Sequence, residues 1–337
     1  NAPRSVWPPG LPEHLSFREV ADAPGRGGRW WAPVGWADEP HRQRQSVWGW
    51  EGTNLLFYGM PGSGPARALL TLGSSLATSY QPDRLHIYAL DFGTRTLAPL
   101  EDLPQVGGVI GPADRERQVR LLRYLQEEVE ARRAKGSMDG SAVVLLLNNY
   151  GGFAASFDHP TDLGHRETLR RIVAEGPGVD VFVVMSADQA AAVPSNLAAL
   201  VPEKLVFRMA DSFDYAALGL PNRDLPDLPD GRAIQVGSGV VVQIADVADS
   251  DLSRIAIQAV PPGATPAAIG VLPRRSDLAD VAHRASMADR DWFLPIGIGD
   301  RHLEHPGFGR GTWRGRCRTA PVPPHLPTRA AGTTRNR

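Results

Sequence analysis

The stretch 54–66, Asn54-Leu-Leu-Phe-Tyr-Gly-Met-Pro-Gly-Ser-Gly-Pro-Ala66, determines the fold that we expect. Its apolar run at 55–58 predicts a short buried strand, which stops at a loop rich in glycine. Pro65 stands where the first residue of a helix favours proline, and leucines follow at i, i+3 and i+7 from Leu69 to Leu76. The sequence therefore predicts a strand, a glycine loop and a helix in direct succession.

On the C-terminal side of this stretch, short apolar runs alternate with helical segments. Runs that are continuously apolar are typical of strands covered on both faces. The predicted strands are 85–90, 142–147, 181–185, 204–208 and 239–244. Helices are predicted between 113 and 134 and around 169–173. Because strands that alternate with helices build a mostly parallel sheet, we expect an α/β fold with helices on both faces of a central sheet.

A glycine loop between a strand and a helix can bind phosphate, because its backbone N–H groups point inward beside the positive end of the helix. The full pattern, G-x-x-x-x-G-K-S/T, adds a lysine for the outer phosphates and a hydroxyl for Mg²⁺. Here Pro65 occupies the lysine position, where it also lacks an N–H donor, and Ala66 occupies the hydroxyl position. Arg67 lies two residues beyond Pro65 and should face elsewhere. The predicted nucleotide-binding residues are Gly59, Met60, Pro61, Gly62, Ser63, Gly64, Pro65 and Ala66.

The acid position of such folds is also replaced. The strand predicted at 142–147 runs into Asn148 and Asn149, where a carboxylate would hold Mg²⁺ directly or through water. An amide cannot balance the charge of a divalent cation, and it cannot act as a general base. We therefore assign no catalytic residue here and expect weak ATP binding and poorly held Mg²⁺. The alternative is a plain strand-to-helix turn, but the flanking elements and the amide-ended strand favour a phosphate loop.

Composition excludes several other classes of protein. The 337 residues carry a formal charge of −1, which does not indicate a generally basic nucleic-acid binder. The one cysteine, Cys317, excludes an intrachain disulfide and a multi-cysteine metal site. The histidines at 41, 86, 159 and 165 have no ligand spacing, so we predict no metal site. No apolar run is long enough to span a membrane.

Composition also divides the chain into segments. Residues 1–30 are rich in Pro, Gly and Arg and are expected to form a linker or extended lead-in to the α/β module at 31–270. Residues 271–304 are expected to hold a linker and the start of a further module, because 31–38 recurs approximately at 293–300. A chance Pro-x-Gly match is the alternative.

The last segment, 305–337, has seven arginines and no acid, and we expect a basic, disordered tail. Arginines in such a tail could touch nucleic acid, but a solvated tail is favoured. The start without Met and the break where the repeat should continue lead us to expect a piece of a longer chain, through truncation or an altered reading frame.

Taken together, these positions resemble the FtsK/SpoIIIE-like P-loop ATPases, and among them the tandem ATPase modules of the type VII secretion motor (the EccC-like proteins). The resemblance spans roughly residues 31 to 270 and is carried by an ordered series rather than by one motif. The series comprises Pro33-Val-Gly35, Arg42-Gln-Arg-Gln45, Asn54–Ala66, Leu90-Asp-Phe-Gly93, Leu103-Pro104, Val109-Ile110, Asn148-Asn149, Val183–Asp188, Leu205–Arg208, Leu220–Pro226 and Gly231-Arg232.

The resemblance implies a RecA-like P-loop NTPase fold and motors that form hexameric rings, with ATP hydrolysed between neighbouring subunits. It implies that Ser186 and Asp188 occupy a polar sensor position and that Arg208 is placed to reach a neighbour's nucleotide. The alternatives are loop residues without function and a surface ion pair. Expected partners are other modules or subunits of a hexameric secretion motor and a secreted substrate protein. The expected location is cytoplasmic, with membrane association through the full-length chain or a partner.

Three functions follow, in decreasing order of support. The first is a type VII secretion ATPase module with a degenerate nucleotide site, which is regulatory or engages substrate and hydrolyses little or no ATP. The second is an ATP-driven DNA translocase, which needs a working loop and phosphate contacts along DNA. The third is a dinucleotide-binding enzyme, which is disfavoured because Arg67 stands where the third glycine of its fingerprint belongs.

Overall fold

The computed structural model describes most of the chain up to residue 277. The described residues are 9–24, 28–136, 140–221, 228–257, 265–273 and 275–277, with the backbone of 293–295 and 307–309. They belong to two compact units, Asn1–Val271 and Leu272–Arg337. In the second unit, β11 (Phe293–Pro295) pairs antiparallel with β12 (Gly307–Gly309). Nearly all of the predicted basic tail lies outside the described residues.

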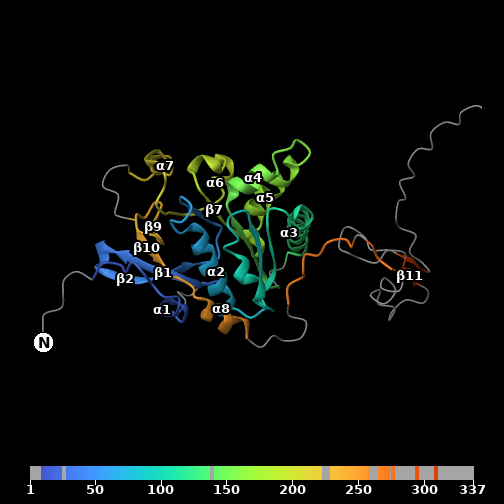
Figure 1. Ribbon diagram of the computed structural model, residues 1–337, viewed down its shortest axis with the longest axis horizontal. Helices are drawn as coiled ribbons and strands as arrows, with labels where there is room; N and C mark the ends of the chain where they lie inside the picture. The colour runs from blue at the N-terminus through green and yellow to red at the C-terminus, as the bar shows by residue number, and fades with distance from the viewer. Residues whose placement is uncertain are drawn as a thin grey trace, which may run out of the picture. The chain divides into compact units, whose positions relative to one another are not determined.

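A parallel sheet forms the centre of the first unit (Figure 1). Its strands are β3 (Leu55–Tyr58), β4 (Leu85–Asp91), β5 (Val106–Ile110), β6 (Ala142–Asn148), β7 (Val181–Ala187) and β8 (Glu203–Val206). They lie in the order β8-β3-β7-β6-β4-β5, and each neighbouring pair is parallel. The predicted mostly parallel α/β fold is therefore confirmed.

Antiparallel strands extend this sheet beyond β8. They are β9 (Arg232–Gln235), β10 (Val241–Ile244), β1 (Ala32–Glu39) and β2 (Arg44–Trp50). They follow β8 in the order β9-β10-β1-β2, which gives a sheet of ten strands. We did not predict β1 and β2 as strands, because Pro33, Gly35 and Gly49 interrupt the apolar pattern. Glycine is required at Gly35, since a Cβ there would collide with the carbonyl of Gln243 on the neighbouring β10.

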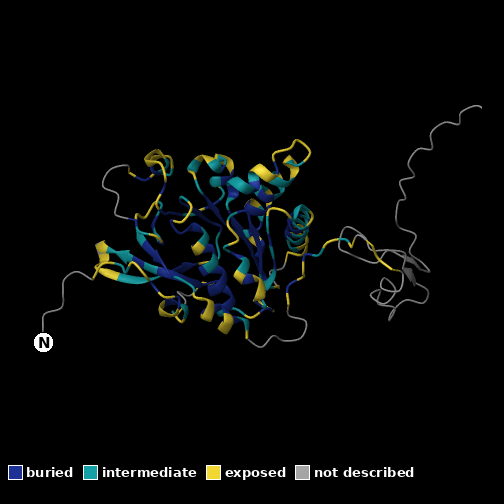
Figure 2. Cartoon of the chain, viewed as in Figure 1, coloured by how far each residue is buried: buried dark blue, intermediate teal, exposed yellow. Residues whose placement is uncertain are grey.

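Helices cover both faces of the sheet, as predicted. They are α1 (Arg18–Ala21), α2 (Pro65–Ser79), α3 (Arg115–Lys135), α4 (Tyr150–Ser156), α5 (Leu163–Glu175), α6 (Ser195–Ala198), α7 (Ser212–Ala217) and α8 (Asp249–Ala256). Short 3-10 turns lie at Pro40–Arg42, Ala98–Asp102, Pro177–Val179 and Ala190–Ala192. Figure 2 shows the parallel strands buried between the helices, with exposed residues on the outer sides of the helices.

The strands bury alternate residues against opposite faces, because successive side chains of a strand point to opposite sides of a sheet. Leu55 and Phe57 of β3 pack in one core with the buried faces of α1, α2 and α8. Leu56 and Tyr58 pack in a second core with α3, α4, α5, α6 and α7. The short strand β3 is thus buried on both sides, which fixes the direction in which the glycine loop leaves the sheet.

Part of the expected lead-in belongs to this packed unit. Leu15, Phe17 and Val20 are buried in the same core as α2. The backbone N–H of Phe17 donates to the carbonyl of Asp246 at 2.9 Å. The short apolar pattern around α1 has no sustained period, which is why the sequence predicted only a lead-in.

A strap of residues 265–269 lies against β5, the outermost strand on the parallel side of the sheet. The hydroxyl of Tyr88 donates to the carbonyl of Ala267 at 2.9 Å. Arg117 Nε donates to the carbonyl of Ile269 at 2.7 Å, and the Ile269 side chain is buried. A Cβ on Gly107 of β5 would lie 3.0 Å from the Ala267 carbonyl oxygen, so the strap passes close to the strand at this residue.

Candidate functional site

The glycine loop leaves β3 at the carboxyl edge of the parallel sheet and leads directly into α2. Its first residues are fixed by neighbouring strands: Gly59 N donates to Ala187 O of β7 at 3.1 Å, and Met60 N donates to Arg208 O at 2.9 Å. Gly62 and Gly64 have φ values of 88° and 138°, a region that favours glycine. The loop therefore has the position and the glycine-dependent turns that a phosphate cradle needs.

The N-terminus of α2 has the backbone shape of a phosphate-binding loop, but Pro65 stands where such a loop has its lysine. Gly64 is the N-cap residue and Pro65 is the first residue of the helix. The Pro65 ring packs on Gly59, where a Cβ would come within 2.9 Å of Pro65 Cγ. Ser63 is buried and its Oγ donates to Met60 O at 2.8 Å, so this hydroxyl serves the loop itself.

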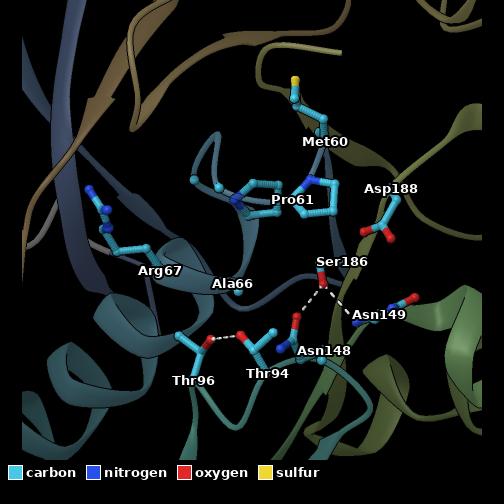
Figure 3. A pocket seen from close by; sticks show the side chains of 15 residues that line it. Met60, Pro61, Ala66, Arg67, Thr94, Thr96, Asn148, Asn149, Ser186 and Asp188 are labelled. Carbon is cyan, nitrogen blue, oxygen red and sulfur yellow. Dashed lines mark hydrogen bonds between the residues drawn. The ribbon is translucent and has the colours of Figure 1, made fainter. Parts of the chain in front are cut away.

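A cavity of about 260 Å³ lies over the glycine loop (Figure 3). From the predicted site it is lined by Gly59, Met60, Pro61, Gly62, Gly64, Pro65, Ala66, Asn148, Asn149, Ser186 and Asp188. Ser63 and Arg208 do not line it. Arg67, Gly93, Thr94 and Thr96 complete the wall. The structure thus brings the loop, the amide-ended strand and the sensor-like residues into one site.

The threonines of this wall were not predicted as site residues. Thr94 and Thr96 belong to the loop after β4, and their hydroxyls are 3.3 Å apart. The sequence signal that could have pointed to their loop is Asp91, the acid that ends β4. Its carboxylate accepts from Gly93 N at 3.0 Å and from Leu97 N at 2.9 Å. This carboxylate therefore holds both ends of the threonine loop.

A buried polar network joins the ends of three parallel strands. Asn148 Nδ2 at the end of β6 donates to Asp91 Oδ1 at the end of β4, at 2.8 Å. Ser186 Oγ on β7 donates to Asn148 Oδ1 at 2.9 Å. Asp91, Asn148 and Ser186 are 1%, 4% and 2% exposed. The amide of Asn148 is thereby fixed in orientation by a hydrogen bond at each end.

Asn149 has a different task from Asn148. Its φ of 64° is in the left-handed region, and its Oδ1 accepts from Gly152 N at 2.9 Å, which caps the N-terminus of α4. Its backbone N–H donates to Ser186 Oγ at 2.9 Å. An asparagine suits this position because its short side chain tolerates positive φ and can serve as the cap.

Charged groups at the cavity are few. Burial raises the pKa of the Asp188 carboxyl above its usual value. Arg67 Nη1 forms an ion pair with Asp246 Oδ1 at 3.0 Å, and Figure 3 shows its side chain directed away from Ala66. Arg208 pairs with Asp230 at 2.8 Å, with both side chains about half exposed. Within the described residues, no group of three or more His, Cys, Asp or Glu is arranged to hold a metal ion.

An apolar groove of about 680 Å³ lies elsewhere on the unit, between α6 and α7. Its walls include Ala198, Ala217 and Leu218, and Phe213 at its side is 76% exposed. Lys204 lines the groove, its Nζ donates to Val201 O at 2.7 Å, and burial lowers the pKa of this amine.

Among the described residues, none of the helices has the length and apolar composition of a membrane span.

Curated relatives of this chain belong to type VII secretion systems. It is 25% identical over 330 residues to the ESX secretion system protein EccC of Geobacillus thermodenitrificans, covering 88% of this chain and 22% of the relative. It is 28% identical over 272 residues to the ESX-4 protein EccC4 of Mycobacterium tuberculosis, covering 77% of this chain and 20% of the relative. The chain therefore spans about a fifth of the length of these two relatives.

Solved structures of such proteins share the fold. The chain matches ATPases 2 and 3 of Geobacillus thermodenitrificans EssC with a TM-score of 0.73 and 21% identity, covering 90% of this chain and 62% of the other. It matches ATPases 2 and 3 of Thermomonospora curvata EccC, solved with a signal sequence peptide, with a TM-score of 0.66, 22% identity and coverage of 90% and 60%. The sequence also matches the profile of the FtsK/SpoIIIE family over residues 30–224, more than half of the chain. The chain therefore belongs to the FtsK/SpoIIIE family.

Proposed function

We propose that this chain carries an ATPase module of a type VII protein-secretion motor whose own nucleotide site hydrolyses little or no ATP. In this role the module is regulatory or engages the exported protein. One observation carries the proposal: around a preserved loop and cavity, Pro65, Ala66 and Asn148 stand at the positions of the lysine, the hydroxyl and the acid. The secretion role itself rests on relatives of which this chain spans only a part.

Phosphoryl transfer depends on stabilising the charge that develops on the phosphate, so these replacements remove its main sources. Pro65 adds neither a cation nor an N–H, and the nearest cation in sequence, Arg67, pairs with Asp246. Asn148 is neutral and committed to Asp91 and Ser186. A nucleotide would still meet the N–H groups at the start of α2, which supports weak binding without turnover.

The groove between α6 and α7 supports the substrate-engaging form of the proposal. A relative of the same fold, Thermomonospora curvata EccC, was solved with a signal sequence peptide. The groove here has apolar walls and a protruding, largely exposed Phe213, which suit an apolar face of a peptide. We therefore place the exported protein's contact in this groove, with other modules or subunits of the motor as further partners.

ATP hydrolysis by the purified chain tests the first part. We expect release of phosphate at the level of a protein-free control. Asn149→Ala serves as the matched variant; it removes the amide that follows the strand and caps α4, and it leaves the residues of the glycine loop unchanged. Turnover well above the control, abolished in Asn149→Ala, would refute a degenerate site.

Peptide binding tests the second part. A fluorescent signal peptide of an exported protein should bind the parent chain, and Phe213→Asp should weaken binding by about tenfold through loss of an apolar anchor. Leu163→Asp is the control, because Leu163 is also exposed but lies on α5, outside the groove. Equal effects of both variants would remove the groove from the proposal.

A further inference from the structure

The FtsK/SpoIIIE family implies Mg²⁺ together with the nucleotide, so the oxygens around the cavity decide whether such a cation fits. In a phosphate-loop site, Mg²⁺ takes a loop hydroxyl and a carboxylate and demands nearly octahedral oxygen geometry. Ala66 offers no oxygen at the hydroxyl position. The hydroxyl of Ser63 is turned back onto the loop, where it donates to Met60 O. The side chains of the glycine loop therefore supply no ligand.

The polar side chains at the strand ends supply no Mg²⁺ ligand either, because they already form hydrogen bonds within the protein. The Asp91 carboxylate accepts three hydrogen bonds, from Gly93 N, Leu97 N and Asn148 Nδ2. The one carbonyl oxygen of the Asn148 side chain accepts from Ser186. All these side chains are almost fully buried. A cation could reach them only by breaking the network that joins β4, β6 and β7.

Asp188 is the remaining acid on the cavity wall. It follows β7, and burial raises the pKa of its carboxyl, which disfavours a negative charge there. Figure 3 shows Asp188 on the opposite side of the cavity from Thr94 and Thr96, so its carboxylate and their hydroxyls do not form one set of Mg²⁺ ligands. The donor set of this cavity therefore does not fit the cation that the family implies.

Neutral hydroxyl groups line another wall of the cavity. Thr94 and Thr96 line the same cavity as the start of α2, and Figure 3 shows both side chains on the side of Ala66. Asp91 fixes the ends of their loop through Gly93 and Leu97. A threonine hydroxyl donates to a phosphate oxygen without needing a metal ion. The cavity thus has backbone N–H donors on one wall and hydroxyl donors on another.

We propose that this cavity takes a nucleotide that is free of divalent cation, with Thr94 and Thr96 as phosphate contacts opposite the glycine loop. The inference rests on the proposed nucleotide site and adds that the nucleotide binds there without Mg²⁺. A metal-free nucleotide keeps its full negative charge, so the N–H groups of the loop, the threonine hydroxyls and Arg67 on the same wall would have to offset it.

Calorimetric titration of the full chain with ADP and with ATP, in EDTA and in excess MgCl₂, tests this inference. Because excess Mg²⁺ converts most of the nucleotide into its metal complex, we expect binding to be at least about tenfold tighter in EDTA than in MgCl₂. Thr94→Val together with Thr96→Val should weaken binding by about tenfold in EDTA. Thr161→Val is the control, because Thr161 is exposed and lies outside the cavity.

The other outcomes of this titration would overturn the inference. Binding that is as tight or tighter in MgCl₂ overturns the inference, as does an unchanged affinity of the double threonine variant. Absence of nucleotide binding in both buffers overturns it too, but leaves the groove and its peptide test intact. Hydrolysis of Mg·ATP by the parent chain overturns both the inference and the degenerate site.

Discussion

Asn148 Nδ2 lies 2.8 Å from Asp91 Oδ1, and this hydrogen bond joins the ends of the neighbouring strands β6 and β4. The amide donor is what Asp91 needs at this place, since its carboxylate is 1% exposed and forms no ion pair among the described residues. A carboxylate at position 148 would instead face Asp91 as a second buried acid. The amide of Asn148 and the carboxylate of Asp91 are therefore linked.

The first prediction concerns this pair. Asn148→Asp should lower the free energy of unfolding by about 3 kcal/mol at neutral pH, because it buries an unpaired charge and removes a donor. Adding Asp91→Asn should recover much of this loss by restoring one amide and one carboxylate. Urea denaturation of the parent, the single variant and the double variant measures both effects. A single variant as stable as the parent would contradict the linkage.

The second prediction concerns the glycine loop. Pro65→Lys with Ala66→Thr should tighten ATP binding by about tenfold, because it adds a cation for the outer phosphates and a hydroxyl. Turnover should stay at the background level, since the strand end still lacks a free acid. The matched control is Pro65→Ala with Ala66→Thr, which opens the loop without adding charge. Equal affinities of the two variants would show that the missing lysine is not what weakens binding.

The third prediction concerns Asp188. Because its carboxyl faces the cavity, Asp188→Asn should tighten nucleotide binding by several-fold at neutral pH. Burial raises the pKa of Asp188, so its charge appears, and the affinity of the parent falls, as the pH rises through this raised pKa. The phosphates titrate near pH 6 in parent and variant alike. The difference between the two titration curves therefore isolates Asp188, and parallel curves would exclude its influence.

The fourth prediction concerns stability and pH. Glu203 accepts from Thr53 Oγ1 at 3.3 Å and from Gln235 Nε2 at 3.0 Å, and burial raises the pKa of its carboxyl. The folded state therefore binds this proton more tightly than the unfolded state, so the free energy of unfolding falls as the pH rises from the ordinary pKa through the raised one. Glu203→Gln should add about 1 kcal/mol at neutral pH and flatten this dependence.

Urea melts between about pH 4 and pH 8 check the Glu203 prediction. Glu101→Gln is a suitable control, because Glu101 is exposed and does not act on the pKa of Glu203. A Glu203→Gln chain that is less stable than the parent at neutral pH would mean that the hydrogen bonds outweigh the cost of burying the charge.

The sequence predicted those elements whose local residue pattern and burial both favour the same structure. The strand at 55–58, the loop and the helix that begins at Pro65 were predicted, because a buried apolar run, glycines and a helix-starting proline each have a local cause. The same holds for β6, whose apolar residues continue to the amide at Asn148. These elements were sufficient to predict the parallel sheet and the position of the loop.

The remaining features depend on contacts between distant segments. Thr94 and Thr96 reach the cavity because Asp91 binds two backbone N–H groups of their loop, and no local pattern reveals that fold-back. The packing of Phe17 depends on Asp246, more than two hundred residues away. The groove beside α7 likewise combines residues from several loops and helices that carry no common motif.

The strap over β5 has a consequence for copies of this module that are crowded together. An open sheet edge offers unpaired N–H and C=O groups to any other strand, and so invites joining of two sheets into one. Tyr88 and Arg117 hold 265–269 over one face of β5 at Gly107, and the strap forms no ladder with the outer border of that strand. A strand added along this border would therefore have to lie beside the strap, which restricts the side chains that it could carry on that face.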